Sequence, residues 1–79
     1  MPRRKVAHPD AARFGAIIRQ LREQRGWTLL VFAGKAGMNA TYLGFLERGE
    51  NMPTLATILS LAGVLDVRAS DVIKEIESV

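Results

Sequence analysis

The side chains best suited to chemistry in this sequence are basic, and they gather in its first half. Residues 1–35 contain eight lysines and arginines against two acidic residues, a net charge of +6. Residues 36–79 contain three basic and six acidic residues, a net charge of −3. A polyanion would be attracted to the first half and repelled from the last residues. This distribution favours a nucleic-acid partner over an ordinary mixed surface.

Groups for catalysis or metal binding do not form a recognisable set. The sequence has one histidine, His8, no cysteine, and carboxylates without a pairing pattern. No nucleophile–base pair and no thiolate metal site can be assembled from them. The glycines stand at predicted helix ends and not in a phosphate-binding loop. We therefore expect no enzyme activity, no cofactor, no metal and no small-molecule ligand, and we give His8 no role.

The length of 79 residues suits one small domain. No apolar run approaches the ~18–20 residues that cross a bilayer, and the N-terminus lacks the apolar core of a signal peptide. We expect a cytoplasmic protein with no membrane partner. Residues 1–9 lack periodicity and contain two prolines, which predicts a flexible basic arm followed by one domain over residues 10–79. The arm would either contact DNA or remain a solvated tail.

Residues 28–49 predict two short helices joined by a tight corner. Thr28 and Asn39 are suited to cap helices over residues 29–36 and 40–48, and Gly37 suits the left-handed end of the first. Two capped helices with a glycine at the corner are typical of a helix-turn-helix. Apolar spacing predicts further helices, and the fold class is all-α; the expected spans are 10–25 (capped by Asp10), 55–65 and 69–77.

The run GWTLLVFAGKAGMNATYLGFLERGENMPTLATILSLAGVLDV resembles the Cro/repressor (XRE-type) family of helix-turn-helix domains. The matching residues are Gly26, Thr28, Ala33, Gly37, Tyr42, Leu43, Leu46, Glu47, Arg48, Gly49 and Pro53. The resemblance covers about residues 13–73. It implies a compact five-helix repressor-like domain that forms a homodimer on a pseudo-palindromic double-stranded DNA operator, with helix 40–48 in the major groove.

The resemblance also implies which positions face DNA, and here this chain departs from the family. Those positions carry Leu29, Ala40, Thr41, Gly44 and Phe45, where the family often has Gln, Arg, Ser or Asn. One hydroxyl, one glycine and three apolar side chains offer little hydrogen-bonded recognition of bases. We therefore add further DNA-contact candidates: Asn39 and Tyr42 for bases, and Arg13, Lys35 and Arg48 for phosphates.

Two accounts of the apolar face remain open. In the first, apolar side chains contact thymine methyl groups, Gly44 permits close approach, and DNA shape supplies much of the specificity. In the second, Leu29, Leu30 and Phe45 form a protein-binding patch on a helix-turn-helix scaffold. We favour the first, and expect a dimeric repressor or autoregulator.

Two further roles concern structure and assembly. In the family, an Arg late in the first helix pairs with the Glu that ends the recognition helix, and these positions carry Arg22 and Glu47. The resemblance thus implies a structural ion pair. Ile76 and Val79 add more apolar surface than a terminal helix readily buries, so we expect them at the subunit contact.

Overall fold

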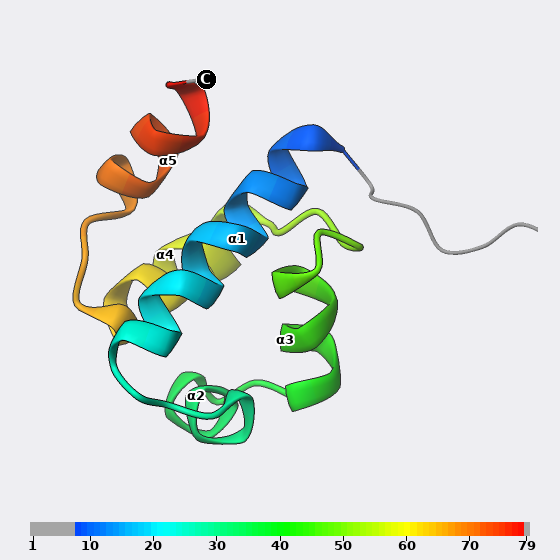
Figure 1. Cartoon of the computed structure of the whole chain (residues 1–79), viewed down its shortest axis with the longest axis vertical. Coiled ribbons are helices and arrows are strands. Elements are labelled where there is room, and N and C mark those ends of the chain that lie inside the picture. Colours follow the sequence, from blue (N-terminus) through cyan, green and yellow to red (C-terminus); the bar gives the residue numbers. More distant parts are fainter. Residues whose placement is uncertain (1–7, 79) are drawn as a thin grey trace, which may run out of the picture.

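The structure, a computed structural model, describes residues 8–78, and these form five α-helices with no strand among them (Figure 1). In chain order the helices are α1 (Pro9–Gln24), α2 (Leu29–Ala36), α3 (Ala40–Glu47), α4 (Leu55–Leu65) and α5 (Ala69–Glu77). The predicted all-α five-helix fold is confirmed. Most of the predicted basic arm, together with Val79, lies outside the described residues.

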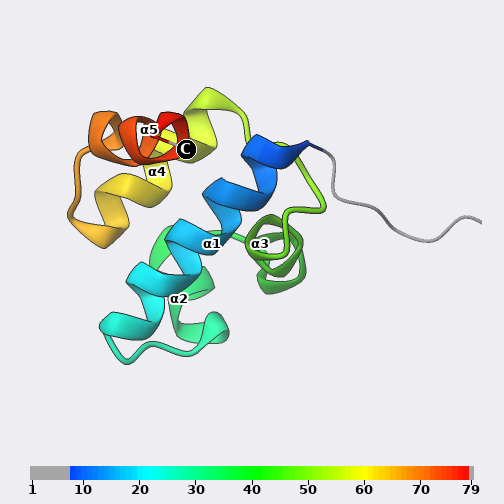
Figure 2. The same cartoon turned by 45° about the horizontal axis from the view of Figure 1, so that its top comes forward.

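The first helix is the element on which the others are arranged. In both views α3 lies on one side of α1 and α5 on the other, and each packs against it (Figures 1 and 2). The second helix packs against α3 and α4, and its axis makes an angle of 111° with α3. Consequently α3 is supported by α1 and α2 and lies at an edge of the molecule.

The helix ends of the central motif follow the predicted capping chemistry. The Thr28 hydroxyl accepts the backbone N–H of Val31 at 3.1 Å, and Asn39 Oδ1 accepts that of Thr41 at 2.7 Å. Gly37 follows α2 with φ of 64°, which supplies the left-handed corner. The third helix ends at Glu47, one residue earlier than predicted, and Arg48 is its C-cap.

The start of α1 differs from the prediction. His8, to which we gave no role, is the N-cap: its Nδ1 accepts the backbone N–H of Asp10 at 3.0 Å. Asp10 was therefore wrongly expected to cap the helix; its carboxylate instead accepts from Arg13 at 2.8 Å. Pro9 is the first helical residue, a position that proline favours because its missing N–H would be unpaired there. The first helix thus begins at Pro9, one residue before its predicted start at Asp10.

Every helix contributes to a single core, which contains Phe14, Ile18, Phe32, Ala33, Leu43, Leu46, Leu61, Leu65, Val72 and Ile76. Ile76 is only 9% exposed, so this side chain is covered by its own chain. We expected Ile76 at a subunit contact because the last helix carries more apolar side chains than it readily buries. The core of this chain covers Ile76, so that reason does not apply to it. Among residues 8–78, the large apolar side chains that are exposed lie elsewhere, on α2 (Leu30, Val31), in the turn before α4 (Met52) and on α4 (Leu55, Leu59).

A close crossing between α1 and α3 depends on Gly15. A Cβ built at Gly15 would overlap the carbonyl oxygens of Leu46 and Glu47, so only glycine permits this approach. The crossing sets the depth at which α3 sits against α1. No single described helix is long and apolar enough to cross a membrane; α2 and α3 meet that description only as a sharply bent pair.

Candidate nucleic-acid interface

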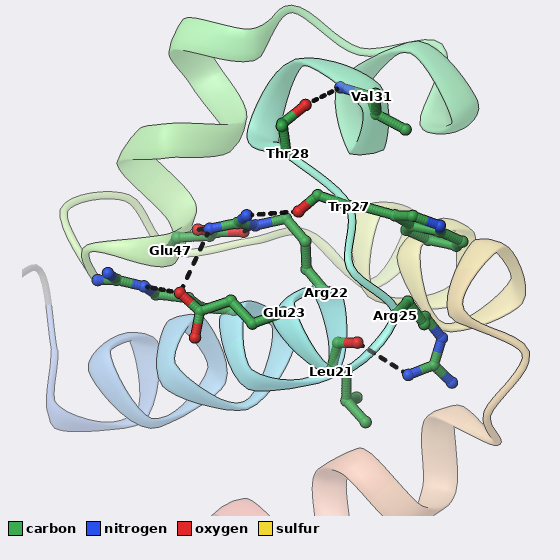
Figure 3. A network of polar contacts seen from close by, with 9 residues as sticks. Leu21, Arg22, Glu23, Arg25, Trp27, Thr28, Val31 and Glu47 are labelled. Atoms are coloured by element: carbon green, nitrogen blue, oxygen red, sulfur yellow. Dashed lines mark hydrogen bonds and ion pairs between the residues drawn. The ribbon is translucent and has the colours of Figure 1, made fainter.

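The predicted pair of Arg22 and Glu47 is present and is nearly buried (Figure 3). Arg22 Nε donates to Glu47 Oε2 at 2.8 Å and Nη2 to Oε1 at 3.1 Å, with the side chains 13% and 6% exposed. The hydrogen bonds that Arg22 donates to Glu47 raise the pKa of the Arg22 guanidinium above its usual value, against the opposing effect of burial. Arg22 is therefore charged at every working pH, and the prediction of an ion pair here is confirmed.

The same guanidinium connects a third segment. Arg22 Nη1 donates to the Trp27 carbonyl at 2.8 Å, directly before the Thr28 cap of α2 (Figure 3). One side chain of α1 thus holds both the segment that leads into α2 and the end of α3. This arrangement fixes the orientation of the two motif helices relative to α1.

The surface formed by α2 and α3 has an open depression lined by Leu29, Ala40, Thr41, Gly44 and Arg48. Four of these are positions that the family resemblance assigns to base contact, and Arg48 was assigned to a phosphate. The structure therefore brings five of the ten candidate residues onto one face. The lining is chiefly apolar, with the Thr41 hydroxyl and the Arg48 guanidinium as its polar side-chain groups.

Gly44 and Arg48 are adjacent within this depression. A Cβ at Gly44 would lie 3.1 Å from Arg48 Nη1 and 3.4 Å from a methyl carbon of Leu29. The Arg48 guanidinium carbon lies 5.2 Å from the centre of the Phe45 ring, and its Nε donates to Glu50 at 3.2 Å. The arginine side chain thus lies back along α3, above the glycine. Sequence reasoning missed this proximity, although a glycine four residues before an arginine on a helix was its signal.

The apolar side chains on this side are less exposed than expected. Leu29 is half-buried and packs against the core, and Phe45 is half-buried with Arg48 over its ring. Leu30, at 74% exposure, is the member of the proposed protein-binding patch that faces solvent fully. The three residues therefore do not form a broad exposed apolar surface.

Other predicted DNA-contact residues lie outside this depression or already interact with groups of the protein itself. Arg13 lines a separate groove between α1 and α5 together with Glu75, and Lys35 Nζ lies 4.8 Å from the centre of the Trp27 ring. Asn39 uses its side-chain oxygen as the α3 cap, and Tyr42 packs partly against the core. Their roles as DNA contacts remain predictions.

Several basic residues that the charge count included have structural partners. Arg19 pairs with Glu23 at 3.1 Å, and Arg25 donates to the Leu21 carbonyl at 2.8 Å and to the Leu65 carbonyl. Arg25 therefore ties the end of α1 to the end of α4, a role that sequence reasoning did not identify. Within residues 8–78 no group of three or more acidic or histidine side chains is placed to hold a metal ion.

The capped helices, the glycine corner and the depression on α3 define a helix-turn-helix domain. The helix-turn-helix family HTH_3 matches residues 18–72, and the chain belongs to this family. The resemblance inferred from the sequence is confirmed. The curated relatives described below are named as transcriptional regulators and not as enzymes.

Relatives of known sequence and structure agree with this assignment. The chain is 41% identical over 70 residues to the HTH-type transcriptional regulator SutR of Escherichia coli, covering 87% of this chain and 39% of SutR. It is 36% identical over 62 residues to the uncharacterized HTH-type transcriptional regulator YazB of Bacillus subtilis, covering 78% of this chain and 90% of YazB. The chain thus spans less than half of SutR, and likewise 46% of the regulator DdrOP3 of Deinococcus deserti.

Solved structures show the same architecture. The restriction-modification controller protein C.AhdI of Aeromonas hydrophila superposes with a TM-score of 0.78 at 32% identity, covering 82% of this chain and 98% of that one. The biofilm master regulator SinR, solved in complex with DNA, superposes with a TM-score of 0.71 at 31% identity, covering 76% of this chain and 97% of that one.

Proposed function

We propose that this chain is a cytoplasmic transcriptional regulator that binds double-stranded DNA as a homodimer and places α3 in the major groove, acting as a repressor or autoregulator. The single observation that carries the proposal is the depression over α2 and α3, which gathers Leu29, Ala40, Thr41, Gly44 and Arg48 on one face. In a helix-turn-helix the start of the second motif helix contacts base edges. The relative SinR was solved in complex with DNA, which supports DNA as the partner of this chain.

The buried ion pair, which lies on the inner face of α3, also supports the proposal. Arg22 and Glu47 hold α3 against α1 on its inner face, so its outer face is presented to a partner in a fixed orientation. A helix that must fit a groove needs such preorganisation, because ordering it on binding would reduce affinity. The pair therefore suits a DNA-binding surface that is built before DNA arrives.

The exposed apolar face of α4 supports a second copy of this chain as the dimer partner. Leu55 and Leu59 lie four residues apart on one helix face and are 68% and 54% exposed. A dimer on a two-fold operator must set its two α3 helices ~34 Å apart, which requires a fixed two-fold interface. This face replaces Ile76 as the proposed interface.

Selection from random duplex DNA, followed by binding measured across salt concentrations, tests the proposed function. We expect enrichment of one sequence with two-fold symmetry, bound more tightly than unrelated duplex by about 10³-fold or more. Enrichment of no sequence, with weak binding to every duplex, would remove DNA-specific regulation and leave only the scaffold.

A further inference from the structure

We propose that Arg48 is a specificity-determining residue that recognises the major-groove edge of a guanine, with Gly44 making room for its side chain and Phe45 and Glu50 holding it in place. This inference rests on the proposed function. It changes the role of Arg48 from a phosphate contact to a base contact. It also gives an otherwise apolar recognition face its charged donor group.

The position of the Arg48 guanidinium is the first support. Side chains on a helix lean toward its N-terminus, so the side chain at the C-cap of α3 extends back over the preceding turn. It lines the depression together with Ala40 and Thr41, the residues at the N-terminal end of α3. That end of a recognition helix faces the base pairs. The guanidinium therefore lies on the recognition face, above Gly44.

Gly44 is the second support, because a larger residue there would occupy the space that the guanidinium uses. A Cβ at Gly44 would lie 3.1 Å from Arg48 Nη1, closer than most Cβ contacts in proteins. Glycine inside a helix lowers its stability relative to alanine. The close approach of Arg48 gives this glycine a function that offsets its cost.

The contacts that hold Arg48 are the third support. Its guanidinium carbon lies 5.2 Å from the centre of the Phe45 ring, and Glu50 accepts from Nε at 3.2 Å and from Nη2 at 3.5 Å. The side chain nevertheless remains about half exposed. A guanidinium that is already oriented loses less conformational freedom when it binds.

Guanine is the base that fits this group. Its major-groove edge presents O6 and N7, two acceptors that an arginine contacts with two parallel hydrogen bonds. The neighbouring Leu29 and Ala40 side chains offer no competing donor, and Gly44 has no side chain. Thr41 supplies one hydroxyl, which does not by itself distinguish guanine from the other bases.

The first test repeats the selection from random duplex DNA with three proteins: the parent, Arg48→Ala and Arg19→Ala. Arg19 is the matched control, since it is likewise a half-exposed arginine paired with a glutamate, at 3.1 Å, but it lies on α1. We expect the parent and Arg19→Ala to enrich the same sequence, with guanine at one fixed position of each half-site. Arg48→Ala should lose the preference at that position alone.

The second test leaves the protein unchanged and alters the DNA. In the duplex that the parent selects, 7-deazaguanine at the fixed position removes the N7 acceptor and keeps base pairing. We expect the parent to bind this duplex at least about fivefold more weakly, and Arg48→Ala to bind both duplexes equally. Because the parent is measured here too, a variant that fails to fold does not leave the proposal undecided.

Two outcomes would overturn the inference. If Arg48→Ala binds all sequences more weakly by the same factor and its salt slope flattens by about one unit, Arg48 contacts a phosphate. If 7-deazaguanine has no effect on the parent, no arginine makes the paired contact to O6 and N7 of that guanine. Either result leaves the proposed function intact, provided that the parent still selects a sequence; a parent that selects none overturns the proposed function itself.

Discussion

At the scale of single residues, Glu47 and Gly44 of α3 affect stability in opposite directions. Glu47 faces inward and closes a nearly buried ion pair with Arg22. Gly44 lies on the outward side of α3, beneath the Arg48 guanidinium, and its lack of a side chain weakens the helix. The inner position thus maintains the fold, and we propose that the outer one serves recognition, which makes their substitutions separable in experiment.

Glu47→Ala should lower the free energy of unfolding by about 3 kcal/mol, because it leaves a nearly buried guanidinium without its carboxylate. Thermal and urea denaturation followed by circular dichroism provide the measurement. Glu23→Ala is the control: this carboxylate is exposed, so its loss should change stability by less than about 0.5 kcal/mol. Equal melting of Glu47→Ala and the parent would contradict a stabilising pair.

Gly44→Ala should raise the free energy of unfolding by up to about 1 kcal/mol and yet reduce selectivity for the preferred DNA sequence. The added methyl group displaces only the flexible end of Arg48, so the cost in the fold is small. Gly63→Ala in α4 is the matched control, because a Cβ there meets nothing within 4 Å. It should stabilise the protein similarly without changing selectivity. If Gly44→Ala selects the same DNA sequence as strongly as the parent, Gly44 has no role in sequence recognition.

At the scale of elements, our proposal assigns DNA contact to α3 and subunit contact to α4. The core takes the inward face of both helices, and what remains exposed differs in chemistry. The open depression on α3 has one hydroxyl and one guanidinium as its polar side-chain groups, whereas α4 presents Leu55 and Leu59 to solvent. Exposed leucines at helical spacing on so small a domain favour association.

Leu59→Glu should convert the proposed dimer to a monomer, because it introduces a charge that would be buried at the α4 interface. Multi-angle light scattering at several concentrations gives the mass directly. Leu30→Glu provides the control, since Leu30 is even more exposed but lies on α2. A dimer that persists in Leu59→Glu places the interface on another face, and a monomeric parent removes the dimer altogether.

At the scale of the whole molecule, the basic first half is less available to a polyanion than its net charge suggests. Arg13, Arg19 and Arg22 each pair with a carboxylate, and Arg25 donates to backbone carbonyls. The ammonium of Lys35 lies over the Trp27 ring instead of against a carboxylate. The long-range field remains positive on this half, but local contacts to DNA must compete with these internal partners.

Lys35→Ala should weaken binding to selected and unrelated duplexes by a similar factor, and flatten the salt slope by about one unit, if Lys35 contacts a phosphate. Binding titrations at several salt concentrations measure both quantities. An unchanged slope would assign Lys35 to packing against Trp27 alone.

Local signals made much of this fold predictable from the sequence. The caps Thr28 and Asn39 and the corner at Gly37 depend on residues a few positions apart, and the structure confirms each of them. Asp10 was mistaken for the cap of α1 because it is the more usual capping residue, whereas the imidazole of His8 had the right position.

Features that depend on distant segments were not predictable. Nothing next to Gly15 in the sequence indicates that the end of α3 crosses it, and nothing next to Ile76 indicates that the core covers it. The candidate DNA face was located by family resemblance. Its organising contact, Arg48 above Gly44, required knowledge of side-chain direction.

Trp27 also provides an intrinsic fluorescent probe of the helix-turn-helix. Trp27 is the single tryptophan of the chain, its ring lies beside Phe32 and under Lys35, and its carbonyl is held by Arg22. Its fluorescence therefore arises from one known place, where the segment leading into α2 meets the pair that holds α3. If loss of that pair exposes the indole to water, its emission will shift to longer wavelength. Loosening of the segment that leads into α2 can thus be followed without a label.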